Sequence, residues 1–93
     1  MATHSEARAQ IARLLGDESL RLSGPEAVQN AIERGLERLS QGILAEAAAS
    51  DDVIDRESAY DFVERRLEFL GPLLHAGQRP RLRDEIRGKI DAW

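Results

Sequence analysis

The chain has 93 residues, a formal net charge of −4, no cysteine and only four aromatic residues. This length indicates one domain near the lower size limit for folding without disulfides or metals. The lack of cysteine excludes disulfides, thiolate metal sites and cysteine nucleophiles. The N-terminal residues show no charged-then-apolar signal pattern, and no apolar run approaches membrane-spanning length. We therefore expect a cytoplasmic protein with a mostly aliphatic core and no membrane partner.

The charge is unevenly distributed along the chain. Residues 1–65 hold seven arginines against thirteen acidic residues, whereas residues 66–93 hold six basic residues against four acidic ones. An acidic body repels phosphates, so wholesale wrapping of nucleic acid is disfavoured. The mildly basic last third is the one exception.

The first predicted helix covers residues 5–15, because its apolar residues recur at helical spacing. Gly16 fits a left-handed residue that ends this helix. In the following loop, residues 17–22, Leu20 and Leu22 alternate, which favours an extended piece. The apolar stripe of the helix consists of Ala7, Ile11, Leu14 and Leu15.

A second, long helix is predicted from about residue 25 to Ser50. Ser23 and Glu26 have capping-box spacing, and Pro25 sits in the first turn, where its missing N–H has no cost. About 25 residues give roughly 37 Å of helix, too long for two short neighbours to cover its apolar side. We therefore predict a symmetric homodimer. Its interface would consist of Val28, Ile32, Leu36, Leu39 and Ile43.

Two glycines, Gly35 and Gly42, lie inside the predicted long helix. Each costs roughly 1 kcal/mol relative to alanine in a helix interior. Close crossing of another helix would explain them, and so would simple tolerance at an exposed position. The sequence leaves both explanations open.

A third helix is predicted to start at Asp55 and to stop at Gly71-Pro72. Phe62 and Phe69 lie beside its apolar face, which consists of Ala59, Tyr60, Val63, Leu67 and Leu70. Residues 72–77 suggest a single helical turn, followed by a break at Arg79-Pro80. A last amphipathic helix carries Leu82, Ile86, Ile90 and Trp93. We expect a helical domain over residues 1–70, with residues 71–93 as a helical extension packed on it.

The short–long–short order of helices, over about residues 7–64, resembles the archaeal and bacterial type of histone-fold protein. Three segments are similar to its signatures: Ile11–Asp17 in the first helix, Arg21–Ser23 at the end of the first loop, and Val53–Ala59 at the start of the third helix. The resemblance implies an all-α, histone-like dimer, to which this chain adds a C-terminal amphipathic helix. It also implies that Arg21 enters a DNA minor groove and that Arg13 contacts a phosphate. The second loop departs from the family, with Asp51-Asp52-Val53 in place of Arg-Lys-Thr.

No catalytic constellation is visible, so we predict that the chain is not an enzyme and uses no cofactor or metal. The two histidines, His4 and His75, have no ligand spacing to each other. Asp51, Asp52 and Asp55 fit helix-end capping better than cation binding. No glycine-rich phosphate loop follows a strand.

The basic tail has two interpretations. Its arginines either contact nucleic acid or an acidic protein, or they pair with Asp84, Glu85 and Asp91 on a solvated helix face. The arginines concerned are Arg79, Arg81 and Arg83.

We therefore predict a non-enzymatic histone-fold dimer that acts as a protein assembly or interaction module, with itself and another protein as partners. The alternative is a small nucleoid-associated protein that binds DNA through Arg13, Arg21 and the basic tail. Such binding would be weak and strongly salt-dependent, because the cations are few and the second loop is acidic.

Overall fold

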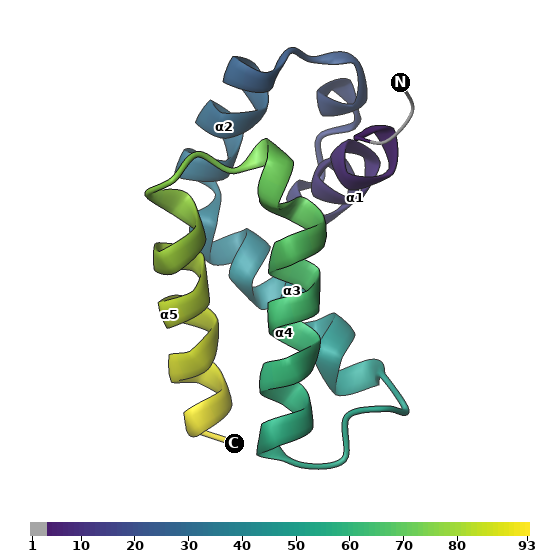
Figure 1. The fold of residues 1–93 in the computed structure, drawn as a ribbon. Coiled ribbons are helices and arrows are strands. Elements are labelled where there is room, and N and C mark those ends of the chain that lie inside the picture. Colours follow the sequence, from purple (N-terminus) through teal and green to yellow (C-terminus); the bar gives the residue numbers. More distant parts are fainter. Residues whose placement is uncertain (1–3) are drawn as a thin grey trace.

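The structure is a computed structural model that describes residues 4–93, and all the regular elements in that range are helical (Figure 1). The all-α prediction is therefore confirmed. The five α-helices are α1 (Ser5–Leu15), α2 (Pro25–Arg34), α3 (Leu36–Ala49), α4 (Arg56–Leu70) and α5 (Gln78–Asp91). Two short 3₁₀ helices, η1 (Glu18–Leu22) and η2 (Gly71–Leu73), connect them.

Local capping signals fix the ends of α1 and α4. Gly16 adopts the left-handed conformation, with φ of 70°, and its N–H donates to carbonyls of the last turn of α1. Asp55 caps α4 by accepting from the N–H of Ser58 at 2.8 Å, while the Ser58 hydroxyl accepts from the N–H of Asp55. Both predicted boundaries are confirmed.

The first loop differs from its prediction. Residues 18–22 form the 3₁₀ helix η1 rather than an extended piece, because the Asp17 carboxylate accepts from the N–H of Ser19 and starts a tight turn. The predicted cap at Ser23 is also wrong. Its hydroxyl donates to the carbonyl of Ser19 at 2.9 Å, and α2 begins after Gly24 without a side-chain cap.

The prediction of one long helix from residue 25 to 50 is wrong, because the chain changes direction at Gly35 between α2 and α3 (Figure 1). A β-carbon at Gly35 would lie 2.8 Å from Cδ2 of Leu15. A β-carbon at Gly42 would lie 2.8 Å from Cδ2 of Leu14. Both glycines therefore mark sites where α1 approaches closely, and the short–long–short order of helices is not observed.

This bend lets a single chain cover the stripe that was expected to form a dimer interface. Four of its five residues, Val28, Ile32, Leu39 and Ile43, are fully buried within one chain, and Leu36 is partly buried. The radius of gyration is 12.8 Å. A single compact domain of this length is expected to have about 12 Å. Because the stripe is covered within one chain, the original reason for predicting a dimer does not hold. Self-association stays a prediction.

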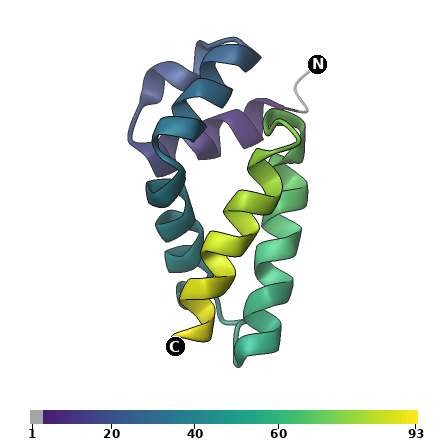
Figure 2. The same ribbon diagram turned by 90° about the vertical axis from the view of Figure 1, so that its left-hand side faces the viewer.

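The last helix, α5, lies alongside both α3 and α4 (Figure 2). It supplies Leu82, Ile86 and Ile90, each fully buried, to the common core. Pro80 lies in its first turn rather than at a break before it. Among residues 4–93, no helix combines the length and the apolar content needed to cross a membrane.

Candidate interaction surface

None of the aromatic side chains of this protein is fully buried, although Tyr60 packs against the core. Among residues 4–93, the buried hydrophobic residues are alanine, valine, leucine and isoleucine only. Tyr60 and Phe62 are partly buried, whereas Phe69 is 41% and Trp93 53% exposed. Aromatic residues are normally among the largest contributors to a core, and on surfaces they are enriched at protein interfaces together with arginine. Their positions therefore indicate where a partner would be expected.

Two of these rings share the outer side of α4. Phe62 and Phe69 are seven residues apart, two helical turns, so they lie on one side of the helix, away from the buried Val63 and Leu67. Arg65 and Arg66 lie between them, and the Arg66 guanidinium sits 5.3 Å from the centre of the Phe62 ring. We call Phe62, Arg65, Arg66 and Phe69 the aromatic–arginine face.

Two neighbouring grooves follow this face. The first has a volume of about 400 Å³ and is lined by Asp52, Phe62, Arg65, Arg66 and Phe69. The second has a volume of about 340 Å³ and is lined by Glu6, Ala9, Gln10, Arg13, Arg21, Arg66 and Phe69. Because two residues line both, the surface runs without interruption from the α3–α4 loop across α4 to α1 and η1.

Glu46 of α3 holds the polar side chains of the second groove in place. Its carboxylate accepts from Nε2 of Gln10 at 3.1 Å and from the guanidinium of Arg13 at 3.0 Å, and Arg66 lies 3.8 Å away. Arg21 pairs with Glu18 at 2.7 Å. The structure thus brings Arg13 and Arg21 to one groove, but each already has a carboxylate partner.

The first groove contains charges without such partners. Within residues 4–93, the guanidinium of Arg65 forms no ion pair, and neither do the carboxylates of Asp51 and Asp52 on the α3–α4 loop. Tyr60 differs from the two phenylalanines in this respect. Its hydroxyl donates to Asp91 and its ring lies under Arg87, so it is engaged by α5.

The tail arginines are directed into the molecule's own helices. Arg81 pairs with Glu33 of α2 at 2.5 Å, and Arg83 pairs with Glu64 of α4 at 2.8 Å. The Nε of Arg79 is buried and has no hydrogen-bond partner among the residues that the structure describes. Of the two interpretations of the tail, pairing within the chain is the one observed for Arg81 and Arg83, although with carboxylates other than the expected ones. None of the three lines either groove.

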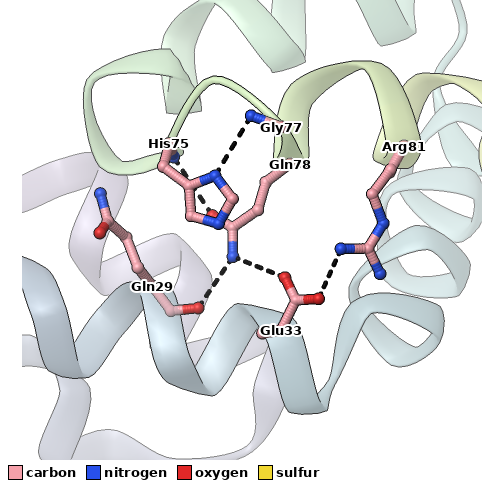
Figure 3. Close-up of polar contacts among 6 residues, drawn as sticks. All are labelled: Gln29, Glu33, His75, Gly77, Gln78 and Arg81. Carbon is pink, nitrogen blue, oxygen red and sulfur yellow. Dashed lines mark hydrogen bonds and ion pairs between the residues drawn. The ribbon is translucent and has the colours of Figure 1, made fainter.

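Arg81 belongs to a polar network that joins α2 to α5 (Figure 3). At its centre the fully buried Gln78 donates from Nε2 to the carbonyl of Gln29 at 2.9 Å and to the carboxylate of Glu33 at 3.2 Å. Its Oε1 accepts from the N–H of His75 at 3.2 Å. Hydrogen bonds from Arg81 and then from Gln78 hold the pKa of Glu33 below its usual value of 4.5. We call Glu33, Gln78 and Arg81 the α2–α5 junction.

Both regions were only partly predictable from the sequence. Phe62 and Phe69 were predicted to lie beside the apolar face of their helix, which agrees with their partial burial, but the groove that they line was not predicted. Gln78 and Glu46 gave little local signal, because the groups that they join on other helices, Gln29 and Glu33 for Gln78 and Gln10 and Arg13 for Glu46, are 33 to 49 residues away in the sequence.

No group of three or more histidine or acidic side chains in the described part of the chain could hold a metal ion. Comparison with family models, with curated proteins and with solved structures finds no match to this chain. The histone resemblance therefore has no support from a known relative, and the all-α class is the level at which the fold is shown.

Proposed function

We propose that this protein is a non-enzymatic interaction module that binds another protein chain through the aromatic–arginine face. The observation that supports it is the separation of residue types: the core is aliphatic, while two phenylalanines and two arginines line a grooved outer surface. Aromatic residues, phenylalanine included, and arginine are enriched at protein interfaces relative to the rest of the protein surface.

The energetic reason for a partner lies in the remaining exposure of the rings. Covering apolar surface stabilises a complex by about 25 cal/mol per Å². Phe69 still exposes 41% of its surface, and the neighbouring Phe62 is only partly buried. Arg65, which has no carboxylate partner in the described residues, could bind one on the incoming chain without first breaking a pair.

The proposal is tested by affinity capture from the cells that make the protein, with competition by excess untagged protein. Wild type should retain a competable set of proteins. Phe62→Ser combined with Phe69→Ser should lose that set. The matched control is Leu22→Ser, since Leu22 is 95% exposed and lines neither groove. Helix content by far-ultraviolet circular dichroism must stay the same in all three. Equal capture by the three proteins would contradict the proposal.

DNA binding is the second candidate, favoured by the presence of Arg13 and Arg21 along one groove with Arg66. Two features oppose DNA binding. The ion pairs of Arg13 with Glu46 and of Arg21 with Glu18 would have to break, and the chain carries a net charge of −4. We therefore expect no shift of duplex DNA at moderate salt, and at most weak, salt-sensitive binding at low salt.

A gel-shift titration at low salt separates the two candidates. If the second groove binds DNA, Arg21→Ala should weaken binding more than Arg34→Ala. Arg34 is exposed, has no ion pair in the described residues and lies outside both grooves, so it controls for loss of charge alone. Equal losses from the two substitutions would remove this groove as a DNA surface.

A further inference from the structure

We propose that a second copy of this chain occupies the first groove, with its α3–α4 loop, residues 51–54, placed against the aromatic–arginine face. Each copy would donate its loop and accept the other's, which gives a two-fold dimer. This inference rests on the proposed function, because it names the partner of the same face.

The α3–α4 loop carries an exposed aliphatic side chain and two carboxylates, of which Asp52 also lines the groove of its own chain. Ile54 is 85% exposed, and the carboxylates of Asp51 and Asp52 have no ion-pair partner in the described residues. Besides Asp52, the groove offers two phenylalanine rings, Arg66 and the unpaired guanidinium of Arg65. An exposed aliphatic side chain beside free carboxylates is therefore complementary to this groove in both polarity and charge.

The loop is held in one shape before any partner arrives. The N–H of Val53 donates to the carbonyl of Ser50 at 3.2 Å, and the N–H of Ile54 donates to the hydroxyl of Ser58 at 2.9 Å. The N–H of Asp52 also donates to the Ser50 hydroxyl, at 3.3 Å. A preorganised segment loses little conformational entropy on binding, which favours association.

The carboxylate and the guanidinium that would pair lie close together on each chain, so the surface is complementary to itself. Asp52 and Arg65 of one chain line the same groove. In a two-fold interface, if residue i of one copy contacts residue j of the other, then j also contacts i. An axis through this groove would place each Asp52 near the Arg65 of the other copy, so two equivalent ion pairs would form.

The charge distribution favours a meeting of two copies at this face. The side chains that line the first groove include two arginines and one acidic residue, a local formal charge of +1, on a chain whose net charge is −4. Two copies repel each other over most of their surfaces. The repulsion between two copies is weakest where the arginines of one groove face the acidic α3–α4 loop of the other copy.

The test is a charge-swap experiment read by sedimentation equilibrium. Arg65→Glu alone should weaken the homodimer by about tenfold or more, because the new carboxylate of each copy would face Asp52 of the other. Asp52→Arg alone should weaken it to a similar extent, because the new guanidinium of each copy would face Arg65 of the other. An equimolar mixture of the two variants should dimerise about as well as wild type. In the mixed dimer, both contacts again join a carboxylate to a guanidinium. A mixture no tighter than either variant would overturn the proposal.

The ring contribution is tested with the variants already described. Phe62→Ser with Phe69→Ser should weaken dimerisation by about thirtyfold, whereas Leu22→Ser should leave it unchanged. A wild-type protein that stays monomeric up to millimolar concentration overturns the second-copy assignment. If that monomer still captures other proteins in a manner that needs Phe62 and Phe69, the proposed function stands without it. If it captures none, both fail.

Discussion

The α2–α5 junction and the aromatic–arginine face use similar side chains in opposite ways. At the junction, Gln78 is fully buried and its amide is hydrogen-bonded on both sides, while Arg81 is paired with Glu33 (Figure 3). At the face, Phe69 is exposed and Arg65 has no carboxylate partner in the described residues. The polar groups of the junction bind one another, whereas the aromatic–arginine face has groups that are available to bind a partner.

This difference separates stability from association. A substitution at the junction should change the free energy of unfolding and leave binding alone, since its groups face each other. A substitution at the aromatic–arginine face should do the reverse, since its groups face solvent. Measuring both quantities for each variant tests whether the two regions are as distinct as their contacts indicate.

The largest effect is expected from Gln78→Leu. The change leaves the N–H of His75 and one oxygen of Glu33 without their buried partner, which should lower the free energy of unfolding by about 2–3 kcal/mol. Urea unfolding followed by far-ultraviolet circular dichroism measures it. The control is Gln41→Leu, on the exposed side of α3, which should stay within about 0.5 kcal/mol of wild type. Similar losses in the two variants would mean that the junction does not stabilise the fold.

A smaller change in stability is expected from Phe69→Ser. A phenylalanine in a core costs about 3–5 kcal/mol when truncated, but this ring is partly open to solvent and should cost less than about 1 kcal/mol. The same urea titration measures it, with association measured in parallel. A loss as large as that of a core residue would show that Phe69 belongs to the fold rather than to a binding surface.

The smallest effect is expected from the charge of Glu33. Its pKa is lowered in the folded state, so folding favours the ionised carboxylate. The stabilisation is therefore complete at neutral pH, and it is lost as the pH falls below about 4.5 and through the lowered pKa. Glu33→Gln lacks this contribution at every pH, so the difference in unfolding free energy between the two proteins should shrink on acidification. A difference that stays constant from pH 6 to pH 3 would show that the Arg81 pair does not contribute.

Acid unfolding of the whole chain is not a sufficient measurement, because Asp55 behaves in the same way. Hydrogen bonds from the N–H and the side chain of Ser58 lower its pKa. Subtracting the Glu33→Gln curve from that of wild type removes this shared contribution. The subtraction is what assigns the pH dependence to the junction.

The parts of the fold that were predictable from sequence are those set by neighbours in the chain. Gly16 ends α1 and Asp55 starts α4 through contacts within five residues, so the sequence pattern carries them. The need for glycine at position 35, where the chain bends, comes instead from Leu15, twenty residues earlier, whose side chain occupies the space that a β-carbon would need. No local propensity reports such a contact.

The candidate site was less predictable for the same reason. Apolar spacing in α4 could not decide whether Phe62 and Phe69 point inward, because the answer depends on which side α3 and α5 cover. Arg13 and Arg21 were identified as surface cations, but their pairing with Glu46 and Glu18 follows only from the packed structure. Likewise, the isolated glutamine at position 78 gains its role from Gln29, across 49 residues.

The aliphatic core also has a spectroscopic consequence. Aromatic rings inside a protein give it near-ultraviolet circular dichroism and shift the methyl resonances of nearby side chains. Here Trp93 is 53% exposed, Tyr60 packs against the edge of the core and no ring is fully buried in the described part of the chain, so both signals should be weaker than in a protein with an aromatic core. By those criteria alone, the folded protein would look less ordered than it is. Amide hydrogen exchange, which depends on the backbone hydrogen bonds of α3 and α5, would instead report its order correctly.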